Sequence, residues 1–101
     1  DLQIFVDCWF VSSMPDLYLR NDLMANYLTQ ISFWWIEYAD LAGIRMDTYP
    51  YPDMDYMTDW TKAVMYEYPD FNVVGEEWNG NHAIVSYWQQ ASKTRTDIHL
   101  N

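Results

Sequence analysis

The sequence predicts an α/β protein built on a parallel sheet. Two short apolar runs, residues 44–47 and 71–78, alternate with longer stretches in which apolar side chains recur every three or four residues. Short runs of this kind are typical of buried strands, and the longer spacing is typical of helices with one apolar face. Strands that alternate with helices form βαβ units, whose strands pair in parallel.

The first helix is expected to begin at Asn21 and Asp22, because both residue types are good N-terminal caps. An apolar face follows, and we expect it to pack against the sheet as part of the core. Its members are Met24, Tyr27, Leu28, Ile31, Trp34, Trp35 and Tyr38. Gly43 then closes the connection to the first strand.

A second helix is predicted between Asp53, which can cap its start, and Pro69, which stops it. Its core-facing residues are Met57, Trp60, Val64 and Met65. The second strand, with β-branched residues at its centre, precedes a turn at Asn79 and Gly80, and residues 82–90 begin a third helix.

The two ends of the chain carry weaker patterns. Residues 1–13 are apolar with a preference for β structure, residues 14–22 are expected to form a loop around Pro15, and residues 93–101 show no pattern. Cys8 is expected to be a small packed residue. Because it is the single cysteine of the sequence, an intrachain disulfide is excluded.

Composition narrows the classes of function. The net charge is −10, so the chain would repel nucleic acid, and no apolar run approaches the roughly 20 residues of a membrane span. The sequence has no glycine-rich phosphate loop, so it does not indicate a nucleotide cofactor. Aromatic residues make up 19% of the chain, which fits a dense core or the stacking of sugar rings. The chain begins at Asp1 rather than methionine, so we expect its N-terminus to be missing and no compartment is predicted.

Two acidic residues end the two predicted strands. Asp47 ends the first and Glu76 the second, so both are expected at the edge of the sheet where parallel strands have their carboxyl ends. Arg45 and Asp47 share one strand face, since strand side chains alternate. The pair is either a structural ion pair or a tuned active-site carboxylate.

Paired carboxylates are what glycoside hydrolysis requires, one as an ionised nucleophile and one as a proton donor. Arg45 would lower the pKa of Asp47 and keep it ionised. Glu76, beside the like charge of Glu77 and the apolar Trp78, is the candidate for the proton donor. Glu77 is a competing candidate, because strand alternation alone does not separate the two.

Three motifs carry a resemblance to a known family. GIRMD (residues 43–47), VVGEEW (residues 73–78) and MPDL (residues 14–17) occur in the order and spacing of the α-amylase family, glycoside hydrolase family 13. The combination most resembles the neopullulanase and cyclomaltodextrinase branch. The resemblance runs from about Trp9 to Trp88.

The resemblance implies a role for each matching residue. Asp47 would be the nucleophile, Arg45 its positioning partner and Glu76 the general acid/base. Trp78 would border the sugar subsites, with a core position as the alternative, and Tyr51 would stack on a sugar ring. The sequence departs from the family pattern at Tyr18, where the family usually has asparagine, and at Pro50-Tyr51, where Lys-His is common.

The resemblance also implies a partial (β/α)8 barrel, because a complete one needs about 250 residues. We expect residues 1–21 to be the end of an inserted loop region, and residues 22–101 to be the helix–strand–helix–strand–helix section around strands 4 and 5. The family's early Asn/His motif and its later His-Asp motif, which holds the third acid, are absent from the sequence. The isolated chain is therefore expected to be inactive.

No metal site is predicted. Asp53, Asp55 and Asp59 lie close in sequence but lack the spacing of a calcium loop, so helix capping explains them better. His82 and His99 have no partners at ligand spacing. A structural calcium remains possible in a complete enzyme of this family, with ligands that these residues do not identify, and no other cofactor is expected.

The function predicted is retaining hydrolysis of α-glucosidic bonds in α-glucans, maltooligosaccharides or cyclodextrins. The partner is thus an oligosaccharide substrate, with no nucleic acid and no membrane. The alternative is a relative that binds sugar or protein and keeps the barrel without turnover. Retention of both Asp47 and Glu76 favours the enzyme.

Overall fold

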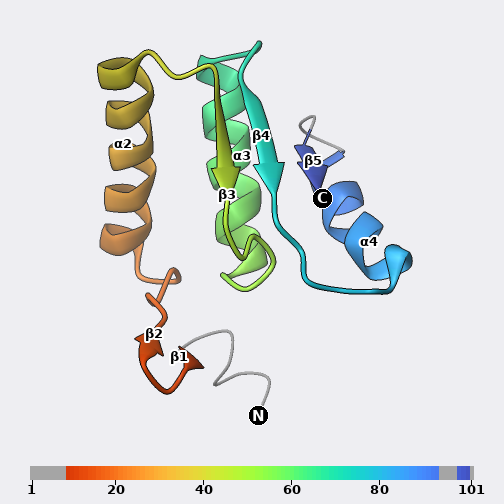
Figure 1. Cartoon of the computed structure of the whole chain (residues 1–101). Helices are drawn as coiled ribbons and strands as arrows, with labels where there is room; N and C mark the ends of the chain where they lie inside the picture. Colours follow the sequence, from red (N-terminus) through yellow and green to blue (C-terminus); the bar gives the residue numbers. More distant parts are fainter. Residues whose placement is uncertain (1–8, 94–97, 101) are drawn as a thin grey trace.

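The computed structural model of the protein describes residues 9–93 and 98–100. Helices and strands alternate along most of this length (Figure 1). In chain order the elements are β1 (Trp9–Val11), β2 (Met14–Pro15), α2 (Asp22–Ala39), β3 (Gly43–Met46), α3 (Met54–Glu67), β4 (Asn72–Gly75), α4 (His82–Lys93) and β5 (Ile98–Leu100).

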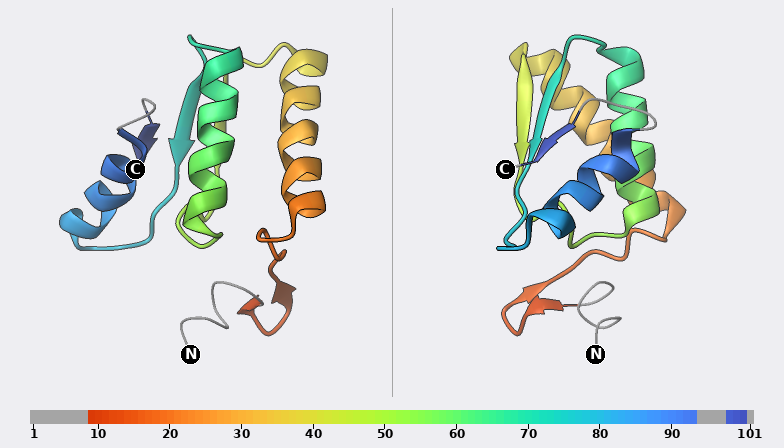
Figure 2. Two further views of the ribbon diagram at one scale, coloured as in Figure 1. Left: turned by 180° about the vertical axis from the view of Figure 1, so that it is seen from behind. Right: turned by 90° about the vertical axis from the view of Figure 1, so that its right-hand side faces the viewer.

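Strands β3, β4 and β5 form one parallel sheet in that order. The pairing of β3 with β4 runs from Gly43 opposite Asn72 to Met46 opposite Gly75. Helices α2 and α3 lie side by side on one face of this sheet (Figure 2). The predicted α/β class and the parallel pairing of the strands are therefore confirmed.

The core lies between α3, α2 and the sheet. Its buried members are Ile36, Tyr49, Met57, Trp60, Val64, Phe71 and Val73. Hydrogen bonds satisfy the polar atoms that this packing encloses. The Tyr49 and Thr61 hydroxyls lie 3.1 Å apart, the Thr61 hydroxyl donates to the Met57 carbonyl oxygen at 2.7 Å, and Trp60 Nε1 donates to Ser32 Oγ at 3.0 Å. Helix α3 thus buries the face that its apolar spacing predicts.

The apolar face predicted for α2 is only partly correct. Met24, Leu28 and Ile31 are half-buried, but Tyr27, Trp34, Trp35 and Tyr38 are exposed, and the rings of Trp34 and Tyr38 stack with their centroids 4.7 Å apart. The buried residue of this helix is Ile36, which the predicted face did not include. Apolar side chains surround more than half of this helix, so one face packs on α3 while the tryptophans lie on another side. Their assignment to the core is wrong for the part of the chain that the structure describes.

Both predicted helix caps are present. The side chain of Asn21 accepts a hydrogen bond from Met24 N, and Asp53 Oδ1 accepts from Asp55 N and Tyr56 N at 3.0 and 3.1 Å. These bonds satisfy amide groups that the first turn of a helix leaves without partners.

Three predictions for the elements need correction. Met14–Pro15 pairs with Trp9–Val11 as a small antiparallel hairpin, although the segment from residue 14 was expected to be a loop. Ile98–Leu100 forms β5 from a tail in which no pattern was found. Strand β4 ends at Gly75, not at residue 78. The third helix is confirmed as α4. The expectation for Cys8 lies outside the described residues.

The described helices include none that could cross a lipid bilayer.

Candidate active site

Asp47 and Glu76 leave the sheet side by side. Each follows the last residue of its strand, and those last residues, Met46 and Gly75, are opposite each other in the register. The amide of Glu76 donates to the Met46 carbonyl oxygen at 2.9 Å, which extends the ladder by one bond. Both acids therefore lie at the carboxyl edge of the parallel strands, where active sites of such sheets form.

Arg45 joins the two acids. Its Nη1 lies 2.7 Å from Asp47 Oδ1, and its Nη2 lies 2.9 Å from Glu76 Oε1. The Arg45 side chain reaches Asp47 because residues two apart on a strand share a face. A planar guanidinium has a fork of donors suited to two oxygen acceptors at once.

The pKa of the Asp47 carboxyl is lowered from its usual value. The hydrogen bond from Arg45 is the largest cause, followed by a hydrogen bond with Glu76. Asp47 is largely exposed, so water screens this ion pair and its contribution to stability is small. Its consequence is chemical, since Asp47 stays ionised and can act as a nucleophile.

Glu76 is held by donors from three directions. Besides Arg45, Trp78 Nε1 donates to Glu76 Oε1 at 3.1 Å and the amide of Thr48 donates to Oε2 at 3.2 Å. Its side chain is 22% exposed, against 72% for Asp47. The two carboxylates thus have unequal environments, as acid and nucleophile roles require.

Glu76 and Glu77 line the same small hollow. The volume of this hollow is about 240 Å³. Burial raises the pKa of the Glu77 carboxyl. Both ion pairs of Arg45 among the described residues go to Asp47 and Glu76, not to Glu77. The contact with Arg45 favours Glu76 as the partner of Asp47.

The two aromatic candidates flank this edge. Trp78 is 79% exposed and contacts Glu76 through its indole nitrogen, so its ring is free to meet a ligand rather than buried in the core. Tyr51 is half-buried in the turn after β3, where its amide donates to the Thr48 carbonyl oxygen at 3.1 Å.

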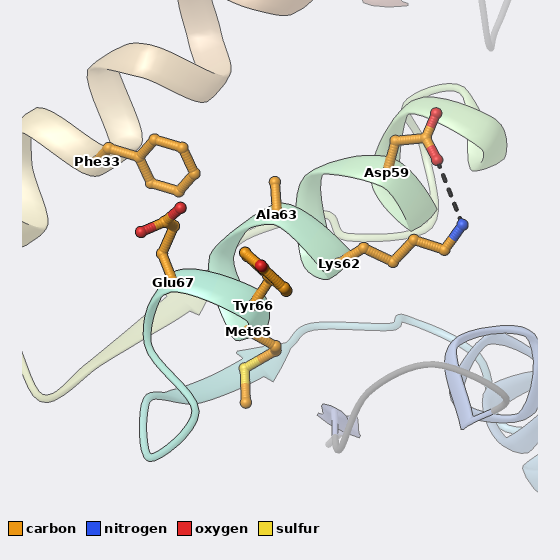
Figure 3. A pocket seen from close by; sticks show the side chains of 7 residues that line it. All are labelled: Phe33, Asp59, Lys62, Ala63, Met65, Tyr66 and Glu67. Atoms are coloured by element: carbon orange, nitrogen blue, oxygen red, sulfur yellow. Dashed lines mark ion pairs between the residues drawn. The ribbon is translucent and has the colours of Figure 1, made fainter.

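A larger hollow lies elsewhere. Its volume is about 730 Å³, and Figure 3 shows its lining from α3 with Phe33 of α2, including the ion pair of Asp59 with Lys62 at 3.7 Å. This open surface of the helix layer has no pair of carboxylates bridged by a cation. We place the candidate site at the smaller hollow because the interacting acids are there.

The acidic residues at the start of α3 serve the helix. Asp53 caps it and pairs with Arg20 Nε at 2.9 Å. Among the described residues, no group of three or more His, Cys, Asp or Glu side chains could hold a metal ion.

Sequence reasoning missed one contributor, Thr48. This residue has a φ of 48°, in the left-handed region that β-branched residues rarely adopt. Only the tertiary setting reveals it, because no residue pattern predicts a threonine with positive φ.

The fold and the site together define a section of a (β/α)8 barrel of the glycoside hydrolase type. Residues 3–101 match the family described as "Alpha amylase, catalytic domain". The chain belongs to this α-amylase family, as its three motifs indicated.

Individual relatives agree. The intracellular maltogenic amylase of Bacillus subtilis (strain 168) is 33% identical over 70 residues, covering 69% of this chain and 12% of the relative. The cyclomaltodextrinase of Thermoanaerobacter pseudethanolicus is 29% identical over 66 residues, covering 65% of this chain and 12% of that protein. The chain thus spans about an eighth of the length of these relatives.

A solved structure supports the fold. The α-amylase from Geobacillus thermoleovorans, solved in complex with acarbose, superimposes with a TM-score of 0.82 at 26% identity. The match covers 91% of this chain and 20% of that one. The described strands and helices are therefore a partial barrel.

Proposed function

We propose that this chain supplies two catalytic acids of a retaining glycosidase that acts on α-glucans, maltooligosaccharides or cyclodextrins. The observation that carries the proposal is the single guanidinium of Arg45 in contact with both Asp47 and Glu76. Carboxyl groups in retaining glycosidases lie about 5–5.5 Å apart. The shared guanidinium supports Asp47 and Glu76 as the pair that would need this spacing.

In the first step, Asp47 attacks the anomeric carbon and the glycosidic carbon–oxygen bond breaks. Glu76 gives its proton to the departing oxygen, so the leaving sugar is released as an alcohol. Arg45 supports this step because it keeps the Asp47 carboxylate ionised. A glycosyl ester on Asp47 results.

In the second step, the Glu76 carboxylate takes a proton from water. The water oxygen bonds to the anomeric carbon from the face that the leaving group vacated, and the ester bond to Asp47 breaks. Two inversions leave the anomeric configuration unchanged. Both acids return to their starting protonation states.

The aromatic residues would hold the sugar. Trp78 projects an exposed ring beside Glu76, and Tyr51 lies in the turn after Asp47. Aromatic faces of this kind can stack on the apolar faces of sugar rings. We assign Trp78 to the border of the sugar subsites and Tyr51 to stacking on a ring.

We also propose that residues 1–21 are the end of an inserted loop region and that residues 22–101 are the barrel section. The β1–β2 hairpin supports this division, because it forms a sheet separate from β3, β4 and β5. The family resemblance leaves room for a structural calcium, but the described residues offer no ligand group for it. No step of the proposed chemistry is routed through a metal.

The test uses a full-length α-amylase-family enzyme that contains this chain. Incubation with an activated fluoroglycoside should trap a glycosyl-enzyme, and mass spectrometry of its peptides should place the sugar on Asp47. Asp47→Asn should remove nearly all turnover and leave circular dichroism unchanged, because the amide is similar in shape but a poor nucleophile.

A label on another residue, or normal turnover in Asp47→Asn, would return Arg45 and Asp47 to the status of a structural ion pair. A protein that binds maltooligosaccharide without turnover would favour the non-catalytic alternative. The 101-residue chain alone should hydrolyse no α-glucan, because it carries two acids and an incomplete barrel.

A further inference from the structure

We propose that Thr48 is a positioning residue for the general acid/base, and that it acts through its backbone N–H rather than its side chain. The inference rests on the proposed function and deepens it. It concerns how Glu76 is held at the angle from which it can protonate the leaving oxygen.

The backbone of Thr48 is the first observation. Two non-glycine residues among those described have positive φ, Asp40 at 50° and Thr48 at 48°. Asp40 is the C-terminal cap of α2, a position where left-handed residues are common. Thr48 ends no helix, and its β-branched side chain makes this conformation costly. Something other than local preference must hold it.

The second observation is where the amides point. In an extended strand, successive N–H groups point to opposite sides. Here two successive amides reach the same residue: Thr48 N donates to Glu76 Oε2 at 3.2 Å, and Tyr49 N donates to the Glu76 carbonyl oxygen at 3.1 Å. Turns that bring successive amides together form concave sites for anionic groups. The left-handed turn at Thr48 thus directs an amide at the carboxylate.

The core keeps this turn in place. Tyr49 is buried, and its hydroxyl lies 3.1 Å from that of Thr61 on α3. On the other side, Tyr51 N donates to the Thr48 carbonyl oxygen at 3.1 Å. Unfavourable backbone conformations persist where the surroundings fix them, and they are frequent at active sites.

The backbone donor at Thr48 is held more firmly than the two side-chain donors to Glu76. Arg45 and Trp78 both contact Oε1 of Glu76, and both side chains are largely exposed. The Thr48 amide contacts Oε2 from a turn anchored in the core. Fixed donors spend no free energy on reorganisation during the reaction, which is the advantage of a preorganised site. The amide therefore sets the direction of the Glu76 carboxyl.

The experiment replaces one atom. In a full-length enzyme containing this chain, Thr48 is exchanged by nonsense suppression for 2,3-dihydroxybutanoic acid, its hydroxy-acid analogue. The resulting ester keeps the side chain and removes the N–H. We expect kcat on maltooligosaccharides to fall by about tenfold, the effect of losing one hydrogen bond to a charged group, with little change in KM.

A comparison of leaving groups separates positioning from a general structural effect. An α-glycosyl fluoride, whose leaving group needs little protonation, should be hydrolysed at nearly the wild-type rate. The matched control is the same ester at Thr58 in α3, which removes a helix amide far from Glu76 in sequence and should leave the rates on both substrates unchanged.

Side-chain variants test the other half of the proposal. Thr48→Gly and Thr48→Asn keep the amide and tolerate positive φ, so both should lose less activity on maltooligosaccharides than the Thr48 ester does. Wild-type kcat in the Thr48 ester, or a loss in these variants as large as the loss in the ester, would overturn the inference. A wild-type enzyme that shows no fluoroglycoside label on Asp47 would contradict the proposed function instead, so the two failures are distinguishable.

Discussion

Gly43 and Asn72 lie closer together than any residue with a side chain at position 43 would allow. A Cβ atom added to Gly43 would lie 2.8 Å from the Asn72 backbone oxygen and 3.2 Å from its Cβ. The two residues are opposite each other at the start of β3 and β4. This contact explains why the GIRMD motif begins with glycine: the strands that carry the two acids approach without room for a methyl group.

Gly43→Ala should therefore separate the strands and destabilise the protein. The clash is with backbone rather than with a flexible side chain, so we expect a loss of about 1–3 kcal/mol in the free energy of unfolding. Urea denaturation followed by tryptophan fluorescence measures it. The control is Gly80→Ala, because a Cβ at Gly80 meets nothing within 4 Å. Equal stability of the two variants would contradict the steric explanation.

Arg45→Met should shift the pH dependence of the complete enzyme. In the proposed mechanism Asp47 must be ionised to attack, so activity should fall as the pH drops through its pKa. Arg45 holds that pKa below its usual value, chiefly through a hydrogen bond. Its removal should raise the pKa and move the acidic limb of the pH–rate profile to higher pH. Arg45→Lys, which keeps the charge but loses the fork of donors, should lie between wild type and Arg45→Met. If the acidic limb of the variants lies at the same pH as that of the wild type, Arg45 does not control the ionisation of Asp47.

Glu76→Gln and Glu77→Gln should differ in kind. Loss of a general acid typically lowers the rate about 10²–10⁴-fold. In Glu76→Gln, kcat on maltooligosaccharides should fall by that factor, and kcat on substrates with good leaving groups should fall much less. Glu77→Gln should retain most of its activity, because the ion pair with Arg45 is made by Glu76. Steady-state kinetics on both substrate types decides between them, and the reverse pattern would make Glu77 the acid.

Asp53→Ala should destabilise the start of α3. The side chain accepts two amide hydrogen bonds and pairs with Arg20, and loss of such a cap costs roughly 0.5–2 kcal/mol. Asp53→Asn keeps the cap without the charge and should lose less, which makes it the matched control. Thermal unfolding followed by circular dichroism measures both.

The same contacts give Asp53 a pH dependence. Burial opposes ionisation, but the hydrogen bonds from Arg20 and the helix amides outweigh it, so the pKa of the carboxyl is lowered. A group with a lowered folded pKa stabilises the fold above its unfolded value and loses that contribution as the pH falls through the folded one. The difference in stability between wild type and Asp53→Ala should therefore shrink in acid, below the usual aspartate pKa of about 3.9.

The exposed aromatic face of α2 should make the isolated chain associate. Trp34 and Tyr38 are 52% and 72% exposed, and contiguous apolar surface of this kind promotes association. The double variant Trp34→Gln with Tyr38→Gln should lower the apparent mass in sedimentation velocity at a given concentration. Tyr66→Gln, at a still more exposed position on α3, is the control. A monomeric wild-type chain would contradict the expectation.

The parts of the fold that could be predicted were those with a local cause. Alternation along β3 placed Arg45 beside Asp47, and capping by Asn21 and Asp53 located both helix starts. Strand alternation did not separate Glu76 from Glu77, because both residues follow β4, which ends at Gly75. The assignment of Glu76 came from the resemblance to the family.

Other features depend on tertiary contacts that no local pattern carries. The three residues of β5 become a strand through pairing with β4. Which side of α2 packs inward is ambiguous when apolar side chains surround most of the helix. The left-handed turn at Thr48 depends on the burial of Tyr49 and the position of Glu76.

The bonds that join Glu76 to the segment after β3 also have a mechanical consequence. The Glu76 amide donates to the Met46 carbonyl oxygen, and the Tyr49 amide donates to the Glu76 carbonyl oxygen. Main-chain hydrogen bonds on both sides of Asp47 therefore hold its segment against Glu76. Thermal motion should carry the two carboxylates together as one rigid piece. Movements of neighbouring loops should then leave the spacing between the Asp47 and Glu76 backbones unchanged. If these two residues are the reacting pair, surrounding loops can vary in sequence without altering that spacing.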